Sequence, residues 1–323
     1  MEKNLKNIKK QMSQMGVFYT PKEDAEKLKA LIDVQYNNVY DPTCGQGNLL
    51  SVFDDEIQKY GQEIDYEELK KAESTLKNFI GYCGDTLSDD GFKGMEFELI
   101  MANPPFSLKW EQNPKDERFS VCKLAPKSKA DWAFNLHIIH HLKHDGQAIV
   151  LNFPGTAYRS GAEKEIREYF IENNLIEKVI SYPPNTFVDT NIATIIYVFK
   201  KNKKTTDVVF VDDDGIEKVV SQDEIKQNDY NLSVSMYIEK EVEKENIDIE
   251  ALNDSVWNNS RKNIIKELEW DKNICEMNDE PEKHMKHIHS LIEDMKRYER
   301  NIIEKNKKSD YQLPGQMSIE DII

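Results

Sequence analysis

The chain has 323 residues, of which 39% are hydrophobic, and a formal net charge of −16. It is long enough for one α/β domain of roughly 200 residues plus an accessory region. So acidic a chain is poorly suited to holding DNA unaided, because phosphate contacts dominate nucleic-acid affinity. No run is apolar enough to form a membrane span or the core of a signal peptide, so we expect a cytoplasmic protein.

The cysteine pattern indicates a reduced protein. The four cysteines include no C-x-x-C pair, which predicts free thiols and neither a disulfide framework nor a zinc site. They are Cys44, Cys83, Cys122 and Cys275.

Residues 1–15 form a short basic arm in front of an aromatic loop, Gly16–Pro21. Threonine is a favoured N-cap and proline a favoured first helical residue. The loop therefore predicts a helix that Thr20 caps and Pro21 begins.

Three predicted strands in succession end in glycine or acidic turns. Asn38–Tyr40 leads into Asp41-Pro42-Thr43-Cys44-Gly45-Gln46-Gly47, where two glycines let the backbone approach a ligand and a following helix N-terminus favours a carboxylate. The strand Ile57–Ile64 carries Glu63 where nucleotide-binding folds place an acid that accepts from ribose hydroxyls. The strand Phe79–Cys83 is followed by Gly84–Leu87.

The fourth strand, which contains Phe97–Met101, ends at Asn103-Pro104-Pro105-Phe106, because a central strand cannot continue through two prolines. The Asn103 amide oxygen and the Pro104 carbonyl could both accept from one exocyclic amino group, and Phe106 offers a face for a planar base. Open parallel sheets bind ligands at the carboxyl ends of their strands, so four such ends in order predict a ligand site.

The second half of the predicted domain continues the α/β pattern. After a polar loop we expect helices over Asp131–His144 and Glu163–Glu172. The histidines at 137, 140, 141 and 144 have metal-like spacing, but no carboxylate lies between them, so we expect no metal.

Further strands are predicted over Gln147–Leu151, Ile176–Tyr182 and Ala193–Phe199. An appended hairpin, Val208–Val211 with Lys218–Val220, is predicted within residues 206–240.

Residues 241–323 are highly charged and helix-forming. An apolar stripe with three-four spacing usually packs on its own domain, but here we favour a partner helix. The stripe consists of Met285, Ile288, Ile292, Met295 and Ile302.

Taken together, these stretches resemble the modification (M) subunits of type I restriction-modification systems, which are site-specific N6-adenine DNA methyltransferases that use S-adenosylmethionine. The resemblance implies a seven-stranded Rossmann-like α/β fold over residues 16–205, with an antiparallel last strand, and a helical C-terminal extension. It runs from about Gly16 to about Lys240 and rests on Gly16–Pro21, Asp41–Gly47, Tyr60–Ile64, Gly84–Leu87, Asn103–Phe106, Asp131–Phe134, Arg159–Glu163, Pro184–Phe187 and Asn228–Leu232.

The resemblance also implies roles for the site residues. Glu63 would bind the cofactor ribose, Asp85 would face the cofactor adenine, and Asn103, Pro104, Pro105 and Phe106 would hold the target base. The whole set implied for S-adenosylmethionine is Phe18, Tyr19, Thr20, Pro21, Asp41, Thr43, Gly45, Gly47, Glu63, Asp85 and Asn103. The stretch Leu151–Gly155 departs from the family's usual Leu-Pro-x-Gly.

The implied reaction needs positioning more than acid–base chemistry. The target adenine must leave the duplex to reach a buried methyl donor, and two fixed acceptors would aim the N6 lone pair at the methyl group. A protein glutamine-amide methyltransferase uses a similar turn, usually with tyrosine in place of Phe106. A non-catalytic cofactor-binding scaffold is the other alternative, against which the intact turn argues.

The acidic charge fits a division of labour that the resemblance implies. Type I modification subunits act on double-stranded DNA but leave sequence reading to a separate specificity (S) subunit. We expect that subunit to bind the C-terminal helices, and the resemblance leaves room for a restriction subunit as well.

Overall fold

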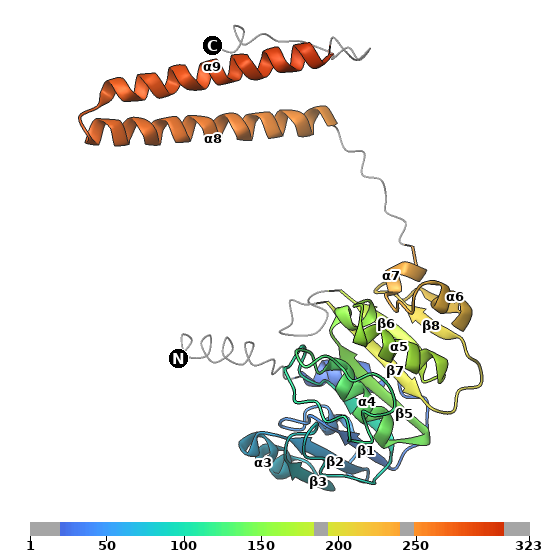
Figure 1. Cartoon of the computed structure of the whole chain (residues 1–323). Coiled ribbons are helices and arrows are strands. Elements are labelled where there is room, and N and C mark those ends of the chain that lie inside the picture. Colours follow the sequence, from blue (N-terminus) through green and yellow to red (C-terminus); the bar gives the residue numbers. More distant parts are fainter. Residues whose placement is uncertain (1–19, 184–192, 240–248, 307–323) are drawn as a thin grey trace. The chain divides into compact units, whose positions relative to one another are not determined.

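A computed structural model describes residues 20–183, 193–239 and 249–306 (Figure 1). The chain divides into two compact units, Met1–Lys240 and Glu241–Ile323. The basic arm 1–15, Phe18, Tyr19 and the stretch 184–187 lie outside the described residues. No helix in the described ranges is long and apolar enough to cross a membrane.

The first unit is built on one mixed sheet in the order β3-β2-β1-β4-β5-β7-β6-β8-β9. β7 lies antiparallel between β5 and β6, while β1 to β5 pair in parallel. The strands are β1 Asn38–Asp41, β2 Gln58–Glu63, β3 Phe79–Cys83, β4 Phe97–Ala102, β5 Leu142–Asn152, β6 Ile176–Tyr182, β7 Thr194–Lys200, β8 Val208–Val211 and β9 Glu217–Val220.

The expected count of seven strands is too low, because the hairpin β8–β9 is part of the main sheet. β8 pairs in parallel with β6, with Val209 opposite Lys178. Val208 and Phe210 are buried, and the Phe210 ring lies 4.3 Å from that of Tyr237. Burial of this apolar face holds the hairpin against the domain.

Helices cover both faces of the sheet, which makes the unit a doubly wound α/β domain. Alternate residues of the central strands enter two separate cores. Val39 and Leu99 pack with Leu28 and Leu69 on one face, whereas Tyr40 and Ile100 belong to the core of the other. The helices are α2 Lys22–Lys29, α3 Tyr66–Thr75, α4 Asp131–His141, α5 Ala162–Glu172, α6 Gln222–Gln227 and α7 Val234–Tyr237.

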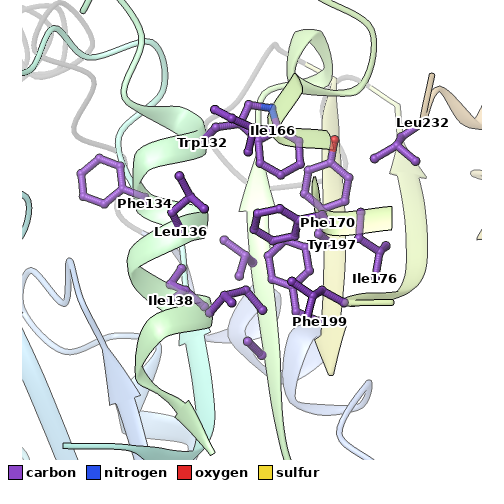
Figure 2. Packing of buried hydrophobic residues seen from close by; sticks show 14 of the residues in the cluster. Trp132, Phe134, Leu136, Ile138, Ile166, Phe170, Ile176, Tyr197, Phe199 and Leu232 are labelled. Carbon is purple, nitrogen blue, oxygen red and sulfur yellow. The ribbon is translucent and has the colours of Figure 1, made fainter. Parts of the chain in front are cut away.

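The larger core lies between α4, α5 and strands β5 to β7. Figure 2 shows Trp132 of α4 packed with Phe170 of α5 and Tyr197 of β7. The Trp132 and Phe170 ring centroids are 5.0 Å apart in an edge-to-face arrangement. All residues of α4 except His140 are buried. This packing fixes the position of the start of the helix, where Asp131 bonds the Ser107 N–H next to the predicted site.

Two predicted helix boundaries and one predicted helix are wrong. α2 begins at Lys22 with Pro21 as its N-cap, so Thr20 does not cap it. α4 ends at His141, because Leu142 already pairs with Phe97 as the first residue of β5. The helix expected after the glycine loop is only a 3₁₀ turn, Leu50–Val52, so no helix dipole is available there.

The second unit contains two packed helices, α8 Ile249–Met277 and α9 Pro281–Asn306. Of the predicted stripe, Met285 and Met295 are exposed and Ile288 and Ile292 are partly buried. The Ile302 side chain lies outside the described residues. Large apolar side chains also lie exposed on α8, namely Val256, Trp257, Trp270 and Met277.

Candidate functional site

The turns that follow β1 to β4 meet at one edge of the sheet. The parallel register pairs Asp41 with Gly61 and Glu63 with Cys83. The strand order reverses between β1 and β4, so the turns that begin at Asp41 and Asn103 flank this switch point. Open α/β sheets bind ligands in the crevice at such a point.

Glu63 ties the glycine loop to the edge of the sheet. Its Oε2 accepts from the Gly45 N–H at 2.9 Å, and its Oε1 accepts from the Asp65 N–H at 3.0 Å. Gly45 and Gly47 have φ of +52° and +82°, in the region that favours glycine. Because each carboxylate oxygen can accept more than one hydrogen bond, Glu63 can hold the loop and still bind a ligand hydroxyl.

Asp41 is buried at the end of β1, and only 1% of its surface is exposed. Burial is the main cause that raises the pKa of Asp41 to about 7, and the nearby Glu63 carboxylate adds to it. The Thr43 N–H donates to Asp41 Oδ1 at 3.0 Å, which partly offsets this effect. Burial makes the ionised form of Asp41 unfavourable. A bound cation would offset this loss of hydration, so Asp41 is well suited to binding one.

Asp85 closes its own turn after β3. Its carboxylate accepts from the Leu87 N–H at 3.1 Å and from the Ser88 hydroxyl at 2.8 Å. The neighbouring Thr86 hydroxyl donates to the Pro42 carbonyl in the glycine loop. The structure therefore brings the Asp85 turn and the Asp41 loop together, as predicted, and gives Asp85 a role in shaping its turn.

Arg118 is a buried residue that the sequence reasoning missed. It donates to the Thr86 carbonyl at 2.6 Å and to the Leu87 carbonyl at 3.0 Å. It also forms an ion pair with Asp116 at 2.7 Å. Because Arg118 belongs to the loop 107–129, this loop supports the Asp85 turn. Composition gave no signal for this contact between segments 32 residues apart.

The histidines of α4 form part of the same buried network. His137 Nδ1 faces Arg118 Nη1 at 2.9 Å, and His137 Nε2 faces the Tyr40 hydroxyl at 3.1 Å. A guanidinium can only donate, so Nδ1 accepts and Nε2 carries the proton. Burial lowers the pKa of His137 well below its usual range. Asp90 and His141 lie beside it, but the adjacent Arg118 cation disfavours a metal ion in this cluster.

The predicted turn is oriented by the end of the aromatic loop. Asn103 Nδ2 donates to the Thr20 hydroxyl at 3.0 Å, across 83 residues of sequence. Asn48 Nδ2 holds the Thr20 carbonyl at 3.1 Å. With its amide NH₂ bound to Thr20, Asn103 has a fixed acceptor oxygen. Pro104 and Pro105 add no N–H donors, so the turn is rich in acceptors.

Phe106 is braced by a group of residues from two other turns. The Ser107 N–H, at a positive φ of +54°, donates to Asp131 Oδ1 at 3.1 Å. The Phe106 ring lies 6.4 Å from Phe153, and the Arg159 guanidinium lies 4.9 Å from the Phe153 ring. Arg159 Nη1 is also 3.8 Å from Asp131 Oδ2.

These contacts connect the residues on both sides of Phe106. Phe153 was missed as a site residue, although it directly follows β5 and lies in the stretch that departs from the family pattern. An open pocket of about 480 Å³ adjoins the group, and its lining includes Lys129, Tyr158 and Arg159. The lining also contains Glu163, which pairs with Arg159 at 3.4 Å, so this side of the site combines aromatic side chains with paired charges.

Comparison with known proteins gives the family of the chain. The model of the N-6 DNA Methylase family matches residues 2–218. The chain belongs to the N-6 DNA methylase family. It is 35% identical to the MpnII type I methylase subunit of Mycoplasma pneumoniae, over 60% of this chain and 42% of that protein. To the MjaIX type I methylase subunit of Methanocaldococcus jannaschii it is 28% identical, over 58% of this chain and 38% of that protein.

Solved methylase structures share the fold. The methyltransferase subunit of a type I restriction-modification system from Streptococcus thermophilus superposes with a TM-score of 0.63 at 30% identity. The match covers 69% of this chain and 59% of that one. The chain spans less than half the length of the MpnII and MjaIX methylase subunits, of which it matches 42% and 38%.

We predict that Asp41→Asn stabilises the protein above neutral pH. Since the folded pKa of about 7 exceeds the usual 3.8, folding favours the protonated acid, and stability is lost as pH rises from about 4 to 7. Asparagine keeps the acceptor without the charge. Its advantage should be near zero at pH 4 and reach up to about 4 kcal/mol at pH 8. Urea unfolding at both pH values measures this difference.

Asp55→Asn is the control, because Asp55 forms an exposed ion pair with Lys77, which lowers the pKa of Asp55. It should show no gain in stability as pH rises. An Asp41→Asn advantage that did not change with pH would contradict the assignment of a buried charge.

Proposed function

We propose that the chain is the catalytic modification subunit of a type I-like restriction-modification system. In this role it transfers a methyl group from S-adenosylmethionine to N6 of a flipped-out adenine in double-stranded DNA. The observation that carries the proposal is the joining of Asn103 to Thr20, beside the Asp41 and Glu63 turns, at the switch point of an N-6 DNA methylase family domain.

The cofactor would occupy the edge formed by the turns after β1, β2 and β3. Asp41 suits the positively charged amino end of the methionine moiety, and the Gly45–Gly47 loop leaves room for a close approach of its backbone. Glu63 and Asp85 suit the ribose and the adenine, respectively. When bound, S-adenosylmethionine supplies an electrophilic methyl group on a sulfonium.

Thr20 would connect the cofactor side to the target side. Its hydroxyl fixes the Asn103 amide, whose oxygen then points as an acceptor for one N–H of the target amino group. The Pro104 carbonyl would accept the other N–H. Withdrawing both hydrogens toward acceptors favours a pyramidal N6, and a fixed turn lowers the entropy cost of reaching that geometry.

Phe106 would provide the stacking face for the flipped adenine. Stacking of a base on an aromatic ring is worth about 1–3 kcal/mol. The contacts from Phe153, Asp131 and Arg159 keep this ring and the following backbone in place without the target. Asn103 has no usable proton equilibrium, so the methylated nitrogen would release its proton to water.

DNA recognition would depend on a separate specificity subunit. At −16 the chain has little prospect of releasing many counterions from DNA by itself. The helices α8 and α9 expose Trp257, Trp270 and Met277 at 67%, 71% and 86%, and isolated side chains of this kind are common at protein interfaces. We assign residues 16–205 to catalysis and 241–323 to partner binding.

The purified chain should bind S-adenosylmethionine, because every residue assigned to the cofactor lies within 18–103. Glu63→Ala removes the acceptor for two backbone N–H groups and for the ribose, so the affinity should fall about 5- to 150-fold, or roughly 1–3 kcal/mol. Titration calorimetry measures the affinity of the wild-type chain and of Glu63→Ala for S-adenosylmethionine. Glu67→Ala, an exposed change on α3, should bind like wild type. A folded wild-type chain that binds no cofactor would contradict the proposal.

Phe106→Ala should lower DNA methylation about 5- to 150-fold, the loss expected from base stacking, and Asn103→Ala should abolish it. Cofactor affinity should stay near wild type for Phe106→Ala. Sequencing that reports N6-methyladenine in cells carrying each variant, or lacking the gene, provides the measurement. Leu108→Ala, an exposed change two residues farther on, is the matched control. Loss of cofactor binding by folded Phe106→Ala would place the turn in another site.

Truncation after Lys240 should leave cofactor binding intact and remove both complex formation and site-specific methylation. The reason is that the exposed apolar residues of α8 and α9 would then be missing. Co-purification with the specificity subunit and methylation assays with and without it measure the effect. Methylation of one defined site by the isolated full-length chain at low salt would contradict the dependence on a partner.

A further inference from the structure

A group of metal-binding side chains lies between α8 and α9. Asp271 and Cys275 are on α8, four residues apart and therefore on one face. His284 and His287 are on α9. Asp271 Oδ2 is 2.7 Å from His284 Nδ1, and Asp271 Oδ1 is 2.7 Å from His287 Nδ1 and 3.9 Å from Cys275 Sγ.

Burial differs among these four residues: Asp271 and His284 are partly buried, whereas His287 is exposed. Among the residues of this unit whose burial is described, Cys275 is the one that is buried, with 4% of its surface exposed. Leu268, Ile288, Leu291 and Ile292 are only partly buried. The two helices have 29 and 26 residues, and so little buried apolar surface holds them together only weakly. Small units with poor cores often gain stability from a structural metal.

The donor atoms already have a spacing that suits zinc. One ligand atom from each of Asp271, Cys275 and His287 lies within 4.8 Å of the others. A tetrahedral zinc ion with bonds of about 2.0–2.3 Å needs its ligands roughly 3.3–3.8 Å apart. Thiolate sulfur, imidazole nitrogen and carboxylate oxygen are the three ligand types that zinc takes in proteins. Small side-chain rotations would therefore be enough.

The two other groups of this kind in the described ranges are less suitable. Asp212, Asp213 and Asp214 offer carboxylates alone, of which two are exposed. The group of Asp90, His137 and His141 contains the Arg118 guanidinium within hydrogen-bonding distance of His137. By contrast, the group on α8 and α9 combines a buried thiol, two imidazoles and one carboxylate.

We propose that Asp271, Cys275 and His287 bind one Zn²⁺ ion that fastens α8 to α9. The Cys275 thiol releases its proton to solvent when sulfur binds the metal, and His287 coordinates through Nδ1 with its proton on Nε2. His284 keeps its hydrogen bond to the second oxygen of Asp271 and so orients the carboxylate, and water completes the tetrahedron. No C-x-x-C pair marks this site in the sequence, because its ligands come from two different helices.

The site is separate from methyl transfer, so its test is independent of the proposed function. The full-length chain is purified without a polyhistidine tag, stripped with a chelator and titrated with Zn²⁺ in a calorimeter. Co²⁺ serves as the spectroscopic probe, since a cobalt–thiolate bond gives a charge-transfer band in the near ultraviolet. We expect one Zn²⁺ per chain and a thiolate band that Zn²⁺ removes by displacement.

Variants assign the ligands. Cys275→Ser should lose the thiolate band, His287→Ala should lower zinc affinity by at least about 100-fold, and His284→Ala by about 10- to 100-fold. His289→Ala, an exposed histidine on the same helix, should bind zinc like wild type. Circular dichroism confirms that each variant keeps its helices.

Two results would overturn the proposal. One is a wild-type chain that binds no zinc or shows no cobalt–thiolate band, a result that does not depend on whether any variant folds. The other is equal weakening by His289→Ala and His287→Ala, which would indicate nonspecific binding to surface histidines.

Discussion

The parallel pairing of β1 to β4 is the constraint on which the rest of the first unit depends. It brings four turns, far apart in the sequence, to one edge of the sheet. Hydrogen bonds then join the first three turns, from Gly45 to Glu63 and from Thr86 to Pro42, and Asn103 joins the fourth turn to Thr20 of the aromatic loop. A shift of one residue in any pair would exchange the two faces of a strand and separate these contacts.

One buried carboxylate, that of Asp41, lowers the stability of the fold near neutral pH. Asp41 is buried near a second carboxylate, and its pKa is raised accordingly. Such a group lowers stability in the free protein near neutral pH, which is typical of a site that is arranged for a ligand and not for the fold alone. Charged Arg118, in contrast, is buried with an acid and two carbonyls as partners. Of these two buried charged residues, Asp41 has no cation beside it among the described residues to balance its charge, whereas the charge of Arg118 is balanced by Asp116.

The sequence predicted most of what is local. The strand ends predicted at Tyr40, Ile64, Cys83 and Asn103 each lie within one residue of the observed ends, because the residue preferences and prolines that end a strand act over a few residues. The antiparallel β7 between β5 and β6 could be expected only from the family resemblance. Pattern reading did not detect that β8 pairs with β6, because strand pairing depends on the packing of the whole domain.

The site was predictable to a similar degree. The turn residues were found because prolines and glycines restrict the backbone locally. Thr20 was expected to cap a helix, but its hydroxyl instead accepts from Asn103, a choice made by tertiary contact. Arg118 and Phe153 went unnoticed because each acts on a segment distant in sequence. The group on α8 and α9 likewise exists only once two helices pair.

Arg118 has a thermodynamic consequence for the two halves of the site. It belongs to the loop that follows the Asn103 turn, yet its guanidinium holds the backbone beside Asp85. Order in either segment therefore favours order in the other. By linkage, whatever effect a ligand on one side has on binding at the other side is returned by the same factor.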